Sequence, residues 1–157
     1  MSQITITIKQ ATTTDLQTLT KLTTELHKYE KEIYPLCKGA SYGADAATKM
    51  LQDQDNNEID VFLAIYNDEA IGYIAGGVEG NDCDQFDTYY IEDLAVTEKY
   101  RSQGIGKQLL DYAQNHAKSK GFKKFGIGVL SANKRVLDYY IRYGFEVYGI
   151  ELNKDIN

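Results

Sequence analysis

Residues 94–107, Leu-Ala-Val-Thr-Glu-Lys-Tyr-Arg-Ser-Gln-Gly-Ile-Gly-Lys, could bind an anion through the backbone. Apolar residues recur at helical spacing from Ile105 onward, so Gly104 and Gly106 bracket a turn that opens a helix. A helix start presents unpaired N–H groups at the positive end of the helix dipole, and glycine lets a ligand approach them closely. No acidic residue lies between Lys99 and Lys107, although the chain has a formal net charge of −6. The turn therefore suits an anionic ligand.

Two other phosphate-binding motifs are excluded. The dinucleotide fingerprint GxGxxG requires a third glycine where Leu109 stands. A P-loop requires glycine at Arg101 and serine or threonine at Gln108. Taken alone, an RxxGxG string is equally compatible with a surface helix that carries a solvated arginine.

The elements that would position this turn follow from hydrophobic periodicity. Alternation of Ile4, Ile6 and Ile8 predicts an edge or near-edge strand, and apolar residues spaced three or four apart predict a helix that ends near Pro35. The resulting sheet is mixed, with helices on both faces, a meander first and a β-α-β crossover after it. The further expected elements are a helix over 44–54, strands over 61–66, 70–78, 88–96 and 125–130, and one long or two short strands over 145–152.

Length and composition indicate one ordinary globular domain, residues 1–157, with 43% hydrophobic and 25% charged residues. No apolar run reaches membrane-spanning length and no secretory signal is visible, so we expect a cytoplasmic protein without membrane contact. Cys37 and Cys83 lie far apart without a CxxC spacing or nearby histidines. Free thiols are therefore expected rather than a disulfide or a metal site.

Charge is distributed unevenly along the chain. Residues 50–98 hold thirteen Asp or Glu and no Lys or Arg, whereas residues 99–142 hold ten Lys or Arg and two acids. The basic stretch 99–142 suits a polyanion, and the acidic stretch 50–98 suits a cation. Solvated loop residues such as Asp82, Asp84 and Asp87 explain part of the pattern. A nucleic-acid partner is disfavoured, because the basic half forms no stripe interleaved with aromatics and the net charge is negative.

The second half of the chain resembles the GCN5-related N-acetyltransferase (GNAT) superfamily. The resemblance covers about Tyr90 to Phe145: Leu-Ala-Val at 94–96, RxxGxG at 101–106, an asparagine six and seven residues before Tyr139 and Tyr140, and Gly144-Phe145. It implies an α/β (α+β) GNAT fold, with a mixed central sheet of six to seven strands flanked by about four helices and splayed between the fourth and fifth strands. The chain ends soon after Phe145, which leaves open how the acceptor pocket is walled and whether a partner subunit completes it.

The resemblance implies acetyl-CoA as co-substrate and no metal. The pantetheine arm would lie in the gap beside the fourth strand, whose backbone would also stabilise the oxyanion of the tetrahedral intermediate. Asn133 would contact the pantetheine, or cap the following helix, or do both. The residues implied for the strand and for the pyrophosphate turn are Leu94, Ala95, Val96, Arg101, Ser102, Gln103, Gly104, Ile105, Gly106 and Lys107.

Acyl transfer to an amine requires two proton movements. Deprotonating an alkylamine of pKa near 10 at pH 7 costs about 4 kcal/mol, which a positioned carboxylate can help recover. Glu92 or Asp93 could serve; we favour Glu92 as base, with Asp93 holding a cationic acceptor, although bulk water could replace Glu92. The resemblance assigns protonation of the CoA thiolate to Tyr140, whereas the alternative is that Tyr139, Tyr140 and Tyr143 are core or interface aromatics.

The string Tyr90-Ile-Glu-Asp-Leu94 with the following motifs resembles spermidine/spermine (diamine) acetyltransferases. A small cationic amine is therefore the expected acceptor, with Tyr29, Glu32 and Tyr34 as further acceptor-binding candidates. Alternatives are an aminoglycoside, a peptide or protein amine, and a non-catalytic acyl-CoA sensor. His27 and His116 are expected to be surface or packing residues, and a homodimer is expected from the family and the Tyr-rich terminal region.

Overall fold

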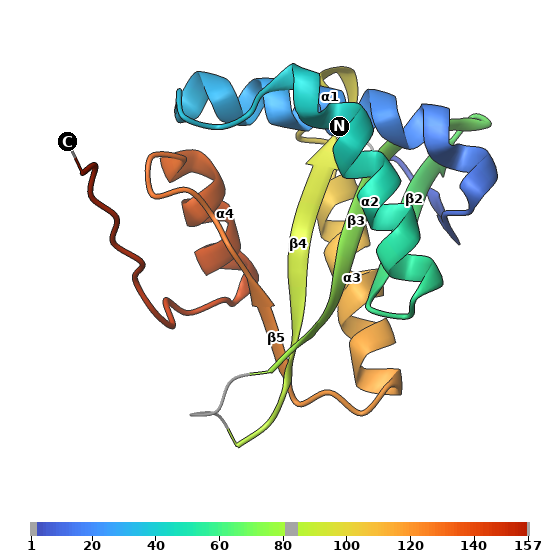
Figure 1. The fold of residues 1–157 in the computed structure, drawn as a ribbon. Coiled ribbons are helices and arrows are strands. Elements are labelled where there is room, and N and C mark those ends of the chain that lie inside the picture. Colours follow the sequence, from blue (N-terminus) through green and yellow to red (C-terminus); the bar gives the residue numbers. More distant parts are fainter. Residues whose placement is uncertain (1–2, 81–84, 157) are drawn as a thin grey trace.

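The computed structural model describes residues 3–80 and 85–156, and within them five strands form one sheet in the order β1-β2-β3-β4-β5 (Figure 1). β5 is parallel to β4, and the other neighbouring pairs are antiparallel. The strands are β1 (Thr7–Gln10), β2 (Ile59–Tyr66), β3 (Glu69–Glu79), β4 (Thr88–Val96) and β5 (Lys124–Ile127). The α-helices are α1 (Leu16–Ile33), α2 (Gly43–Asp55), α3 (Ile105–Ser119) and α4 (Lys134–Tyr143).

Alternation along β2 divides the core into two layers. Phe62 and Ala64 join one buried cluster with α3 and Tyr140 of α4, whereas Val61 and Leu63 join a second cluster with α1 and α2. Successive strand residues point to opposite faces, so a continuous apolar run such as β2 is buried on both. The predicted mixed sheet with helices on both faces is confirmed.

The prediction of six to seven strands is wrong. Within the described residues the sheet has five, because residues 145–156 form no strand (Figure 1). Phe145 stacks on Phe125, but Val147, Ile150 and Leu152 are 66–88% exposed, so beyond Phe145 little apolar burial offsets the entropy cost of ordering the segment as a strand. The predicted strand over 125–130 is also shorter than expected and ends at Ile127.

The first strand, predicted from Ile4, Ile6 and Ile8, begins only at Thr7, whereas the other elements lie close to the expectation. β1 lies at the sheet edge, α1 ends at Ile33 just before Pro35, and the turn at Asn67 and Asp68 joins β2 to β3. Cys37 is a free thiol, whereas Cys83, Asp82 and Asp84 lie outside the described residues. In the part of the chain that is described, no helix is long and apolar enough to cross a membrane.

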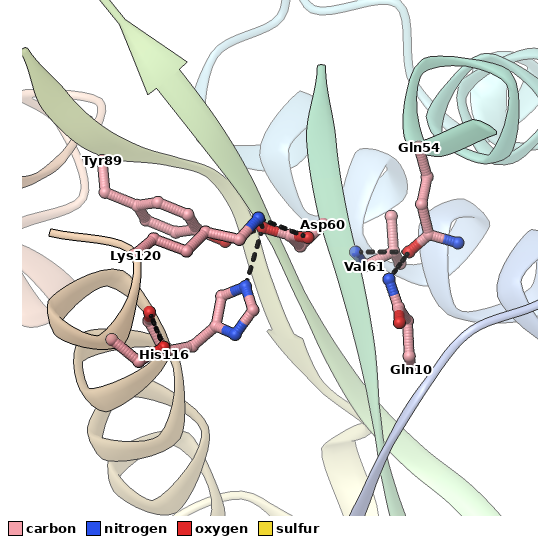
Figure 2. Close-up of polar contacts among 8 residues, drawn as sticks. Gln10, Gln54, Asp60, Val61, Tyr89, His116 and Lys120 are labelled. Atoms are coloured by element: carbon pink, nitrogen blue, oxygen red, sulfur yellow. Dashed lines mark hydrogen bonds and ion pairs between the residues drawn. The ribbon is translucent and has the colours of Figure 1, made fainter. Parts of the chain in front are cut away.

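A buried carboxylate ties α3 to the sheet (Figure 2). Asp60 on β2 is 9% exposed and accepts hydrogen bonds from Tyr89 Oη (2.9 Å), His116 Nε2 (3.0 Å) and Lys120 Nζ (2.9 Å). These donors keep its pKa below the ordinary value, against the opposing effect of burial. His116 and Lys120 are four residues apart at the end of α3. Their pairing with Asp60 therefore fixes to the sheet the helix that follows the predicted anion-binding turn, residues 101–107, called the anion turn below.

Candidate active site

The turn between β4 and α3 has the geometry predicted from its glycines. Gly104 is the N-cap of α3 with φ +80°, a left-handed conformation that favours glycine, and Ser102 also has a positive φ of 60°. The first helical bond runs from Gln108 N–H to the Gly104 carbonyl at 3.2 Å. Backbone N–H groups of residues 105–107 therefore have no intrahelical acceptor. At Gly106 an added Cβ would meet only Tyr139 Oη, at 3.9 Å, so the backbone there is open to a ligand.

The basic side chains at the turn are already engaged. Arg101 Nε donates to the Val96 carbonyl at 2.9 Å, and its guanidinium pairs with Glu25 at 3.2 Å. Lys107 pairs with Asp111 at 2.6 Å. The anion-binding capacity of the turn therefore resides mainly in its backbone.

Helix α4 lies along the start of α3 through residues four apart. Arg135 donates to Ser102 Oγ at 3.0 Å, Tyr139 reaches Gly106, and Tyr143 donates to Asp111 at 2.7 Å. Sequence reasoning did not identify Arg135, whose only signal was its place in the first turn of α4. This row places Arg135 beside the turn, as a third basic side chain after Arg101 and Lys107.

Tyr140 lies on the same helix and is 7% exposed, packed against Tyr139 and Phe145 with ring centroids 5.6 and 5.7 Å apart. Burial raises the pKa of Tyr140 above its ordinary value. The phenol is therefore protonated at neutral pH, as a proton donor must be.

Asn133 caps α4 by position, yet its side chain makes no capping hydrogen bond. Its Oδ1 accepts a bond from Tyr29 Oη on α1 at 3.5 Å, and the Arg101 guanidinium lies 5.2 Å from the centre of the Tyr29 ring. Tyr29 thus connects α1 to the cap of α4 and to the turn.

Strand β4 has two neighbours at its start and only one at its end. It pairs with β3 from Thr88 to Val96, whereas its pairing with β5 covers only Thr88 to Ile91. Just beyond Ile91 the register with β3 skips Glu92, because Asp93 faces Ala75 and Ile91 faces Gly76. An extra residue of this kind is a β-bulge, which re-aims side chains and is frequent beside active sites.

The bulge explains how two adjacent acids reach one pocket. In a regular strand Glu92 and Asp93 would point to opposite faces. Both line the same pocket of about 180 Å³, formed between α1, α2 and β4. The other lining residues are His27, Tyr42, Ala46, Lys49, Met50 and Asp53.

Three candidates lie elsewhere. Tyr29, Glu32 and Tyr34 are not among the lining residues: Glu32 is exposed on α1, and Tyr34 is the half-buried C-cap of that helix. Sequence reasoning missed His27, Tyr42 and Asp53 as pocket residues. Only Asp53 carried a signal, as part of the acidic stretch 50–98.

The pocket favours a cation. Burial raises the pKa of Asp93, although Tyr73 Oη donates to its carboxylate at 2.9 Å. Glu92 keeps an exposed side chain, yet partial desolvation by the pocket and the charges of Asp93 and Asp53 raise its pKa. Lys49 pairs with Asp53, so two carboxylates lack a cationic partner within the described residues.

Comparison with known proteins matches this chain to one family. The sequence model of the "Acetyltransferase (GNAT) family" matches residues 23–145. The chain is 38% identical over 55 residues to thialysine N-epsilon-acetyltransferase of Sus scrofa, covering 35% of this chain and 32% of that protein. It is 31% identical over 94 residues to N-alpha-acetyltransferase 50 of Danio rerio, covering 59% of this chain and 54% of that protein. The matches thus span about a third and about half of these relatives.

Among solved structures, AAC(6')-Iy in complex with a bisubstrate analog, CoA-S-monomethyl-acetylneamine, superposes with a TM-score of 0.73. The two share 20% sequence identity over 98% of this chain and 99% of the other. This likeness supports the α+β fold alone. Since the family match covers most of the chain, the predicted membership is confirmed: this protein belongs to the GNAT family of acetyltransferases.

Proposed function

We propose that the protein transfers the acetyl group of acetyl-CoA to a primary amine by direct attack in a ternary complex, and that the acceptor is a small cationic amine such as a polyamine. The observation that carries the proposal is the pocket in which the bulge at Glu92 brings Glu92 and Asp93 together, one residue before the Leu94–Val96 segment. This arrangement sets a cation-binding site directly beside the strand that would hold the thioester.

Acetyl-CoA would occupy two backbone sites. The N–H groups from Ser102 to Lys107 would bind the pyrophosphate, with Arg135 as a neighbouring cation, since the Arg101 N–H already donates to the Glu98 carbonyl at 3.2 Å. The pantetheine would pair with Leu94–Val96, and the end of β4–β5 pairing at Ile91 supports a splay of these strands there. A backbone N–H of that segment would stabilise the oxyanion. The fold neighbour bound to a CoA-containing bisubstrate analog supports this placement.

Two side chains would move the protons. Glu92 takes a proton from the ammonium, directly or through a water, and the neutral amine nitrogen then attacks the thioester carbonyl carbon. The second proton lost by nitrogen passes through solvent and replaces the one that Tyr140 gives up. The raised pKa of Glu92 brings its basicity closer to that of the amine. When the tetrahedral intermediate collapses, the C–S bond breaks and Tyr140 donates its proton to the departing sulfur. Asp93 would hold the acceptor's positive charge.

Pocket size narrows the acceptor. A volume of about 180 Å³ is below the roughly 300–1,000 Å³ typical of pockets for drug-sized ligands. The pocket therefore suits the amine-bearing end of a slender chain better than a complete aminosugar. The relatives' names include an N-epsilon and an N-alpha acetyltransferase, so peptide amines belong in any test.

The test is thiol release from acetyl-CoA with spermidine, 1,4-diaminobutane, an aminoglycoside, a lysine peptide and a free α-amine peptide. Turnover of a polyamine that falls at least about tenfold in Tyr140→Phe supports both acceptor class and acid role. Turnover of the aminoglycoside or a peptide alone would overturn the acceptor assignment. No turnover despite thermal stabilisation by acetyl-CoA would favour a sensor.

We also propose that the protein acts in the cytoplasm as a homodimer. Val147, Ile150 and Leu152 in the C-terminal segment are largely exposed, and a partner subunit would bury them. Sedimentation of the full chain and of Ile150→Asp tests the dimer, which the substitution should weaken.

A further inference from the structure

One buried side-chain polar atom among the described residues has no hydrogen-bond partner: Nε2 of His27. The residue lies on α1 and lines the acceptor pocket with Asp93, and its side chain is 13% exposed. Such orphan atoms are rare, because their lost hydration is not offset by a protein contact. The orphan atom at the wall of a binding pocket points to a partner that the chain itself does not supply.

The imidazole is held in one orientation. Its Nδ1 lies 3.1 Å from Oε2 of Glu30, one turn later on α1, and its ring meets the Tyr42 ring edge-on at a centroid distance of 5.1 Å. A carboxylate can only accept, so Nδ1 carries the hydrogen in this pair. In the neutral ring Nε2 is therefore a lone-pair acceptor.

Charged groups from three parts of the chain act on this ring. Glu30 on the same helix and Asp93 on β4 raise the pKa of His27, whereas burial and Lys38, in the segment before α2, lower it. The hydrogen bond to Glu30 is the largest influence, and the net direction is upward. Protonation would turn Nε2 into a donor and would place a positive charge near Asp93, which an ammonium ion would also need.

We propose that neutral His27, oriented by Glu30, accepts an N–H of the acceptor amine at Nε2, so that acceptor binding requires the unprotonated imidazole. This inference rests on the proposed function and specifies its substrate class. A primary alkylammonium has three N–H donors, which Asp93, Glu92 and His27 Nε2 can satisfy together. Unhindered primary amines should therefore be preferred to N-methylated ones. His27 is a binding and positioning residue in this account and performs no step of bond exchange.

The kinetic test measures the KM for the polyamine between about pH 5.5 and 8.5, the range in which histidine titrates. The chain has only two histidines, so each can be substituted in turn. The wild-type KM should rise as pH falls through the pKa of His27. His27→Phe should raise the KM about tenfold at pH 8 with the acetyl-CoA KM within twofold. His27→Gln keeps an acceptor but cannot titrate, so its KM should lose the pH dependence. Glu30→Gln should move the midpoint to lower pH.

The matched control is His116→Gln, which keeps a donor for Asp60 and should retain the wild-type pH profile. An unchanged KM in His27→Phe, or a preserved pH profile in His27→Gln, would overturn the inference while leaving the proposed function intact.

A binding experiment separates the two proposals if no amine is acetylated. In protein labelled with ¹⁵N-histidine, 1,4-diaminobutane at pH 8 should shift the Nε2 resonance of His27 and leave that of His116 unchanged. A shift without turnover would reject the enzymatic proposal and keep His27 as an amine ligand. No shift at His27 up to millimolar diamine would overturn the role of His27.

Discussion

The molecule contains two carboxylate and histidine assemblies built from similar parts. In each, an aspartate on a strand accepts a 2.9 Å hydrogen bond from a buried tyrosine on another strand of the sheet. Tyr89 of β4, two strands away, donates to Asp60 of β2, and Tyr73 of the adjacent β3 donates to Asp93 of β4. In each, a helical histidine lies near the carboxylate and influences its pKa. The assemblies differ in what completes them.

The Asp60 assembly is complete within the chain. Lys120 and His116 supply the cationic partner and the remaining hydrogen bond, and the pKa of Asp60 is lowered. Asp93 has no cationic partner in residues 3–80 and 85–156, its pKa is raised, and His27 nearby keeps an orphan nitrogen. A satisfied cluster stabilises the fold, whereas an unsatisfied one reserves its capacity for a ligand.

Of the substitutions that test this difference, Asp60→Asn should have the largest effect, which is a loss of stability. Asp60→Asn removes the charge that Lys120 and His116 pair with at a buried site, so the free energy of unfolding should fall by about 2–3 kcal/mol. Urea unfolding at pH 7 measures this. Asp93→Asn in the same assay should be neutral or stabilising; a loss as large as that of Asp60→Asn would mean that both assemblies are structural.

The next effect is on activity. Asp93→Asn should lower kcat/KM for the polyamine about a hundredfold, because the acceptor's positive charge loses its counter-ion. The acetyl-CoA KM should change little. A rise of similar size in the acetyl-CoA KM would show instead that the substitution disturbs β4, where Leu94–Val96 would bind the donor.

The free energy of unfolding should depend on acid pH in opposite ways at the two aspartates. A lowered pKa means that Asp60 adds stability above its unfolded-state value of about 3.8 and loses it as pH falls further. A raised pKa means that the native state binds more protons at Asp93, so this residue costs stability as pH rises above about 3.8 toward neutrality. Thermal unfolding of Asp60→Asn and Asp93→Asn from pH 3 to 7 should therefore diverge from wild type in opposite directions; parallel curves would refute the contrast.

The smallest effect concerns the tyrosines. Tyr89→Phe removes one hydrogen bond to a charged group and should cost about 1.5 kcal/mol of stability with activity unchanged. Tyr73→Phe should cost a similar amount but also raise the polyamine KM a few-fold, because Asp93 loses the bond that favours its ionised form. Equal activities in the two variants would place Tyr73 outside the acceptor site.

Much of the fold could be predicted from local sequence patterns. The glycine spacing at 104–106 and the apolar periodicity after Ile105 predicted the turn and α3, because both are set by residues close in sequence. The alternation that predicted a strand over 145–152 was misleading, since a strand also needs a neighbour to pair with, and that pairing is not a local property.

The candidate site depended more on long-range arrangement. Glu92 and Asp93 were recognisable as acids beside β4, but the bulge that turns both into one pocket is a cross-strand register with β3. His27 was expected to be a surface or packing residue, because nothing in its helical neighbourhood shows that α1 brings it to face β4. The ion pair between Arg101 and Glu25, which are 76 residues apart, could not be predicted from the sequence either.

Thiol release from acetyl-CoA with the amine panel, run on wild-type protein and Asp93→Asn side by side, shows directly whether Asp93 holds the acceptor. We expect the wild type to acetylate a polyamine and Asp93→Asn to lose about a hundredfold in kcat/KM for it while still binding acetyl-CoA. If both proteins turned over the polyamine equally, the unsatisfied carboxylate of Asp93 would have no part in holding the acceptor.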